Sequence, residues 1–188
     1  MEHHNREYFL FSACGLNCGL CPHYYTSGVS KCPGCGGQEW WARGMSCGLL
    51  SCTQRRGLDY CFECGEYPCA RFAHATTFDA FITHKNQLDD LSRAKAEGIV
   101  SYREVQQAKM GILQSLLADY DDGRRKSLFC TAVNLLPLPD LQEVTRRIAS
   151  EAASAVSVAE RARVAARLLE ELAQAQGVSL RLRKKPKA

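Results

Sequence analysis

Ten of the 11 cysteines lie between residues 14 and 69, and their spacing restricts what this segment can fold into. They read Cys14-x3-Cys18-x2-Cys21, Cys32-x2-Cys35, Cys47-x4-Cys52 and Cys61-x2-Cys64-x4-Cys69. Residues 12–72 also hold ten of the 14 glycines and few aliphatic runs, so apolar burial alone would hardly stabilise the segment. Bound metal would supply the missing folding free energy, as it does in small zinc domains.

The oxidation state of these cysteines depends on the cellular compartment. No apolar run approaches the ~20 residues that span a bilayer, so we expect no membrane association. The apolar stretch in "MEHHNREYFLFSAC" is too short for a secretory signal. We therefore expect a cytoplasmic protein with thiols rather than disulfides, in which clustered cysteines are metal ligands.

The C-x2-C pairs favour zinc, because two such pairs separated by a loop can build a tetrahedral four-thiolate site. One complete set is Cys18, Cys21, Cys32 and Cys35. The remaining C-x2-C pair, Cys61 and Cys64, needs two further ligands. Cys47 and Cys52 are the nearest in sequence and complete a second set. About two zinc ions per chain follow from this grouping. Cys14 and Cys69 flank the two sets and could be alternative ligands, a free redox pair or packed thiols.

An iron–sulfur cluster is the alternative cofactor. Cys14, Cys18 and Cys21 have the three-cysteine spacing of radical-SAM [4Fe–4S] sites, but Leu20 replaces the usual aromatic residue. The strand–helix alternation of the barrel that such enzymes need does not follow. Ligand type alone does not separate zinc from iron on sulfur, so a [4Fe–4S] redox protein or enzyme stays open.

The net charge of +4 is a weak argument for nucleic-acid binding. The positive excess is confined to the tail "RLRKKPKA", and thiolate ligands would remove it. Tyr24, Tyr25, Trp40 and Trp41 could stack on bases, but we expect them to cover the small core. An unknown protein or a small molecule is therefore the expected partner, rather than nucleic acid.

After residue 75, the apolar residues recur at the spacing that is typical of helices. It predicts helices over 76–98, 101–123, 124–137, 140–152 and 157–177. Their expected starts are Thr76 or Asp79, Ser101 with Glu104, Asp140 with Glu143, and Ser157 with Glu160. Alternation over 178–183 predicts a short edge strand. The expected fold is mostly α. A small irregular cysteine-rich metal-binding module (1–75) packs on a helical region (76–188) that ends in a short terminal strand.

Four stretches carry a resemblance to a known family: "CGLNCGLCPHY", "KCPGC", "CTQRRGLDYCFECGEYPC" and "YDDGRRKSLFCTAVNLLPL". They resemble a cysteine-rich bacterial and archaeal family of unknown function, domain of unknown function number 3795, and the resemblance extends to "GVSLRLRKK". It implies a small soluble prokaryotic protein with a metal-binding cysteine module and no established activity. It also marks "YDDGRRKSLFC" as a motif.

That motif has two interpretations. In the first, Asp121, Asp122 and Arg124 form a turn between two helices. In the second, they lie with Cys130 near a pocket against the cysteine module. Cys130 itself is expected to be a small buried apolar residue.

The sequence contains no Gly-rich phosphate loop, nucleophile elbow or HExxH motif. His23 and His74 lie near cysteines and could replace a ligand, although lone histidines usually do not. Four-thiolate sites without an open position are structural. The sequence therefore favours a non-enzymatic zinc-binding protein that acts as a structural or interaction module.

Overall fold

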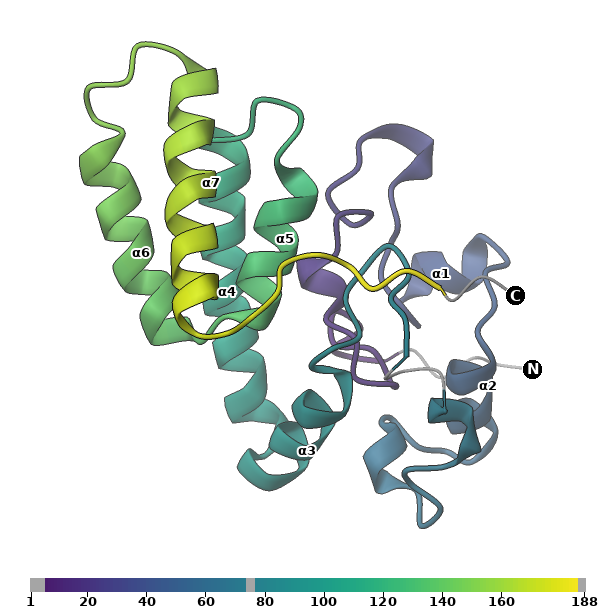
Figure 1. The fold of residues 1–188 in the computed structure, drawn as a ribbon. Coiled ribbons are helices and arrows are strands. Elements are labelled where there is room, and N and C mark those ends of the chain that lie inside the picture. The colour runs from purple at the N-terminus through teal and green to yellow at the C-terminus, as the bar shows by residue number, and fades with distance from the viewer. Residues whose placement is uncertain (1–5, 74–76, 186–188) are drawn as a thin grey trace. The chain divides into compact units, whose positions relative to one another are not determined.

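The computed structural model describes residues 6–73 and 77–185, and Figure 1 shows them as a ribbon. They divide into two compact units. Unit 1 combines the described residues of Met1–Arg103 with those of Leu182–Ala188, and unit 2 is Glu104–Arg181. In sequence, unit 2 is thus an insertion into unit 1. The predicted domains, 1–75 and 76–188, stay a prediction, because compactness does not establish which segments fold independently.

Unit 1 consists largely of turns and short helices, in keeping with its many glycines and few aliphatic runs. Its elements are η1 (Cys18–Leu20), η2 (Gly28–Ser30), α1 (Gln38–Ala42), α2 (Gly48–Arg55), η3 (Cys61–Glu63), η4 (Ala70–Phe72) and α3 (Gln87–Glu97). The 3-10 turns η1 and η3 begin at a cysteine, and Cys69 is the N-cap of η4. Cysteines therefore lie at the start of each of these 3-10 turns.

A small core holds unit 1 together. Its buried members are Phe11, Cys14, Tyr60, Cys61, Phe72, Leu91, Ala94 and Tyr102. Hydrogen bonds add to it: Asn17 Nδ2 donates to Asp90 Oδ2 at 2.7 Å, and the Tyr102 hydroxyl donates to Asn17 Oδ1 at 3.1 Å. The Gln87 side chain donates to the carbonyl of Cys14 at 2.8 Å. These hydrogen bonds hold the loop that contains Cys14 and Asn17 against α3 and against the first turn of the following helix.

Unit 2 is helical. Its elements are α4 (Ile99–Asp119, whose first turn belongs to unit 1), α5 (Lys126–Leu135), α6 (Leu138–Glu151) and α7 (Val158–Ala175). Helix α7 packs against both α5 and α6 (Figure 1). Amphipathic spacing places Leu141, Ile148 and Leu169 in the interior. The predicted mostly helical fold is therefore confirmed.

None of the helices within residues 6–73 and 77–185 is long and apolar enough to cross a membrane.

The two ends of α7 follow the predicted capping chemistry. Ser157 and Glu160 form a reciprocal capping box at the start, with Glu160 N–H donating to Ser157 Oγ at 3.2 Å. At the other end Gly177 has φ +67°, and the N–H groups of Gly177 and Val178 donate to the carbonyls of Gln174 and Ala173. This is a Schellman motif, and it explains why a glycine ends the helix.

Three other predicted helix starts are wrong. The segment 77–86 is irregular, α3 begins only at Gln87, and Thr76 lies outside the described residues. Helix α4 begins at Ile99, so Ser101 lies inside it rather than at its cap. Helix α6 begins at Leu138, which places Asp140 in its first turn instead of at its cap. Capping signals recur inside helices, so a signal alone does not identify a start.

The predicted terminal strand is also wrong. Residues 178–183 form no strand, and the part of the chain that the structure describes is without strand altogether. A strand needs a neighbouring strand for its backbone hydrogen bonds. Here Val178 completes the cap of α7, and the N–H of Arg183 bonds a side chain instead.

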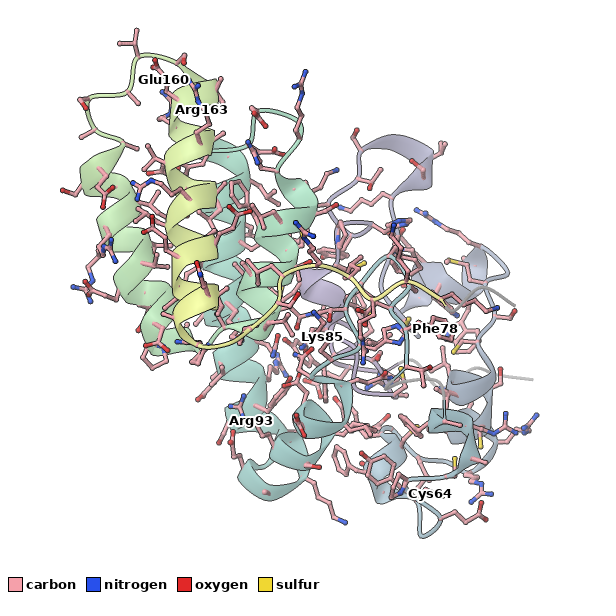
Figure 2. All side chains as sticks on the ribbon, in the orientation of Figure 1. Cys64, Phe78, Lys85, Arg93, Glu160 and Arg163 are labelled. Carbon is pink, nitrogen blue, oxygen red and sulfur yellow. The ribbon has the colours of Figure 1, made fainter. Side chains whose placement is uncertain are left out.

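That side chain belongs to Asp79, whose carboxylate is 0% exposed. It accepts hydrogen bonds from the backbone N–H groups of Arg183 (2.6 Å) and His84 (2.7 Å), and the Arg183 guanidinium lies 2.8 Å from Oδ1. In return the Asp79 N–H donates to the carbonyl of Arg183 at 2.9 Å. Figure 2 labels Phe78 and Lys85, the sequence neighbours of Asp79 and His84. The terminal segment of unit 1 is therefore bound to the loop before α3.

Replacement of Arg183 tests this anchor. In Arg183→Gln the buried Asp79 carboxylate loses its counter-charge, and we expect the free energy of unfolding to fall by about 3 kcal/mol. Lys184→Gln, a change at the exposed neighbouring residue, should cost less than about 0.5 kcal/mol. Urea denaturation measures both values. Equal losses in the two variants would show that the anchor contributes no stability.

The anchor also predicts a pH dependence. Burial alone would raise the pKa of Asp79, but the hydrogen bonds from Arg183 and His84 hold it below its ordinary value of 3.8. The stability gained from this ionised carboxylate is therefore complete above that value and is lost as the pH falls through the lower folded pKa. We expect the wild type to lose more stability than Asp79→Asn between pH 5 and pH 2, as measured by urea denaturation. Parallel losses would contradict this assignment.

Candidate functional site

Four of the predicted ligands, Cys18, Cys21, Cys32 and Cys35, line one cavity of about 440 Å³ in unit 1. The first two lie on the 3-10 turn η1, where Cys21 N–H donates to the carbonyl of Cys18 at 3.2 Å. This turn brings both residues of a C-x2-C pair to the same wall. No disulfide joins any of the 11 cysteines.

The second pair, Cys32 and Cys35, is joined by a Pro33-Gly34 turn. Gly34 has φ +88°, a conformation that costs little for glycine alone. A Cβ at this position would lie 2.7 Å from Cδ2 of Phe9, so the turn also packs closely on the chain before the first cysteine. Glycine therefore fits this position for two reasons: backbone conformation and lack of space.

The four sulfurs differ electrostatically. The Cys35 thiol donates a hydrogen bond to the Cys18 sulfur, and together with the Cys35 backbone N–H and the charge of Arg6 it holds the pKa of Cys18 below the usual thiol value despite burial. The same hydrogen bond, aided by burial, raises the pKa of Cys35. Burial raises the pKa of Cys21 to about 12 and also raises that of Cys32. Cys18 is therefore the group's preferred thiolate.

Arg6 lies beside this group, although no sequence pattern marks it as a site residue. It is only 4% exposed, and its guanidinium lies over the Tyr60 ring, 4.6 Å from the centroid. None of its side-chain nitrogens has a hydrogen-bond partner among the described residues. A buried cation without a paired anion is costly, so negative charge at the nearby Cys18 would offset that cost.

A second group of cysteines consists of Cys52, Cys61, Cys64 and Cys69, which line a cavity of only about 30 Å³. Burial, with the nearby sulfurs of Cys14 and then of the group itself, raises the pKa of Cys61 to about 12. Cys64 (Figure 2) accepts hydrogen bonds from Arg56 Nη1 at 3.0 Å and from the Glu66 N–H at 3.5 Å. The Cys64 sulfur is thus already an acceptor for two neighbouring N–H groups.

The structure places Cys69, rather than Cys47, beside this second group. Cys47 is the N-cap of α2 and packs with Trp40 and Leu50, whereas Cys52 lies inside the helix and faces the small cavity. Cys14 lines neither cavity and belongs to the core of unit 1, with its sulfur 3.2 Å from Ser12 Oγ. Cys14 and Cys47 are therefore the two cysteines outside the groups.

These groups are not assembled metal sites. Among the described residues, no three histidine, cysteine, aspartate or glutamate side chains are arranged so that they could hold a metal ion. The predicted irregular, cysteine-rich segment is present, but its description as a metal-binding module is not borne out by the positions of the side chains. The reason is local: the sulfurs face shared cavities and neighbouring donors without converging on one point.

Other candidate residues have simpler positions. His23 lines the larger cavity, and His74 lies outside the described residues. Asp121 Oδ1 accepts hydrogen bonds from the N–H groups of Gly123 and Arg125, and Asp122 Oδ1 accepts one from Arg124 N–H, each at 3.0 Å. These bonds support the turn interpretation of the motif. Cys130 is buried in α5, as expected.

Comparison with known proteins identifies the cysteine-rich segment. Residues 10–74 match the family described as "Protein of unknown function (DUF3795)", which confirms the resemblance over about a third of the chain. The motif from Tyr120 onward and the terminal stretch lie outside the match. No curated protein and no solved structure matches the chain.

Substitution of Gly34 tests the geometry of the second pair. Gly34→Ala combines an unfavourable positive φ with a contact to Phe9, so we expect a loss of about 3 kcal/mol in unfolding free energy. The matched control is Gly44→Ala, at φ +63° with open space around the added Cβ, which should cost only about 1 kcal/mol. Urea denaturation measures the difference. Equal costs would mean that Phe9 does not restrict the turn.

Proposed function

We propose that this chain is a thiolate metal-binding protein in which Cys18, Cys21, Cys32 and Cys35 hold a zinc ion. The observation that carries the proposal is their position around one cavity beside Arg6, a buried guanidinium without a hydrogen-bond partner in the described chain. Four thiolates from two C-x2-C turns are a donor set that zinc prefers. Binding would require the cysteine side chains to turn toward a common point.

Charge supports the proposal. Four neutral thiols would leave Arg6 buried without a counter-charge from residues 6–73 and 77–185, whereas zinc with four thiolates carries a net charge of −2. Such a dianion beside Cys18 would stabilise the guanidinium, and the guanidinium would stabilise the dianion in return. The polar environment of the group therefore suits an anionic metal centre better than a set of neutral thiols.

The second group is proposed to hold a second zinc ion through Cys52, Cys61, Cys64 and Cys69. The cavity of about 30 Å³ that all four cysteines line suits an ion or a water, and Cys52, Cys64 and Cys69 also line a more open hollow of about 460 Å³. Arg56 and the Glu66 N–H already donate to Cys64, as outer partners of a thiolate ligand do. This set replaces Cys47 of the sequence-based grouping with Cys69.

The proposed role of the metal is to stabilise the structure. Unit 1 has a small apolar core, so metal binding would contribute folding free energy that burial does not supply. Closed four-thiolate sites leave no position for a substrate, which fits a structural or interaction module rather than an enzyme. An iron–sulfur cluster at Cys14, Cys18 and Cys21 stays the alternative cofactor, although Cys14 does not face the cavity of the other two.

Metal analysis of cysteine variants tests the ligand sets. We expect about two zinc ions per chain in the purified protein, and about one in either Cys32→Ser or Cys69→Ser. Cys47→Ser is the matched control and should retain two, because Cys47 lines neither cavity. Elemental analysis with titration of free thiols measures both metal and ligand. Iron with sulfide and a brown colour would reject zinc, and loss of zinc in Cys47→Ser would reject the grouping.

Replacement of Arg6 tests the charge argument separately. Arg6→Gln should bind zinc at the first group at least tenfold more weakly than the wild type, because the dianion loses its buried counter-charge. A chelator competition titration measures the affinity of each site. The second group should be unchanged and serves as an internal reference. Unchanged affinity at both sites would show that Arg6 does not stabilise the first one.

A further inference from the structure

The larger cavity has more space than a metal ion needs. Its volume of about 440 Å³ falls in the range of small-molecule sites. The second cysteine group also lines a hollow of similar volume, but there the wall carries Arg55, Arg56, Glu66 and Arg71 instead of large apolar side chains. In the cavity at the first group, the cysteines occupy part of the wall. The remaining wall is largely apolar and consists mainly of Leu16, Trp40, Met45, Phe81 and Ile82.

The lip of this cavity is also apolar. Val29, on η2, is 99% exposed, and Phe81, on the loop before α3, is 51% exposed. Both side chains line the cavity, and the Phe81 ring packs on His23 with the centroids 4.3 Å apart. Large apolar side chains are rarely left this exposed together unless something covers them. The apolar surface therefore continues from the wall to the mouth.

The charged residues of the lining are both cations. Lys31 and Arg43 contribute to it, and no aspartate or glutamate does. Arg43 is partly neutralised by Glu39 at 2.9 Å, and its Nη1 donates to the carbonyl of Lys31 at 2.6 Å. The ammonium of Lys31 lies over the Tyr24 ring, 5.3 Å from its centroid, with no carboxylate paired to it in the described chain. Lys31 is thus available for an anionic group.

We propose that this cavity binds a small monocarboxylate with an apolar chain or ring. The carboxylate pairs with Lys31 at the mouth, and the apolar body lies against Leu16, Met45 and Ile82 beneath the lip of Val29 and Phe81. This inference goes beyond the proposed metal function. It rests on the apolar wall of the cavity and on Lys31; zinc held by the four cysteines would add a net charge of −2 to the same wall and weaken the binding of the carboxylate.

Decanoate is a suitable probe, with decanol as its neutral counterpart. Trp40 lines the cavity, so saturable changes in tryptophan fluorescence below the micelle concentration report binding to the full chain. We expect decanoate to bind about fivefold more tightly than decanol, because the alcohol makes no ion pair with Lys31. Absence of saturable binding, or equal affinity of the two probes, would overturn the proposal.

Two variants locate the binding. Lys31→Gln should abolish the preference for decanoate over decanol, while the exposed control Lys95→Gln on α3 should keep it. Phe81→Asp should weaken decanoate at least tenfold, and Val100→Asp, at another exposed apolar residue, should not. A preference that survives Lys31→Gln, or binding unaffected by Phe81→Asp, rejects this site. Zinc content measured in every sample separates loss of the cavity from loss of metal.

Discussion

The buried carboxylate of Asp90 fixes the position of the first cysteine loop. It accepts hydrogen bonds from Asn17 at 2.7 Å and Asn86 at 2.6 Å, and Asn17 in turn accepts one from the Tyr102 hydroxyl. Asn17 directly precedes Cys18, so the group of cysteines around the larger cavity depends on this network for its position. Loss of any member would leave buried polar groups unsatisfied, which costs more than the bond itself contributes.

Unit 1 therefore uses directional interactions where a larger domain would use apolar burial. The network at Asp90, the anchor between Asp79 and Arg183, and the contact of Gly34 with Phe9 each fix one loop. Within this frame the eight grouped cysteines line hollows of different character. The hollow at the first group has a largely apolar wall, whereas the larger hollow at the second group is lined by charged side chains, so the two groups need not have the same role.

Local patterns predicted the helical region well, and long-range contacts explain the errors. The capping box at Ser157 depends on residues three positions apart, and it formed as predicted. The helix predicted over 76–98 is present only from Gln87 to Glu97, and its start is wrong because the Asp79 carboxylate binds Arg183, 104 residues away in sequence. The terminal strand failed because alternation describes one face of a strand without supplying a partner.

The same distinction applies to the cysteines. Cys18, Cys21, Cys32 and Cys35 were grouped from the spacing of two tight turns, and the structure places them around one cavity. The pairing of Cys47 with Cys52 rested on proximity in sequence. Five residues along a helix correspond to a rotation of about 140° between the two side chains, so they face different surroundings. Arg6 had no sequence signal, because burial of its guanidinium depends on Tyr60 and other distant residues.

The anchor between Asp79 and Arg183 also has a consequence for the order of folding during synthesis. The ribosome makes Asp79 long before Arg183, and all of unit 2 is translated between them. Until Arg183 emerges, the carboxylate lacks this counter-charge and the loop before α3 lacks its partner. The contacts of α7 with α5 and α6 join residues made before Arg183, so they do not have to wait for it. Unit 1 begins first in the chain and is completed last.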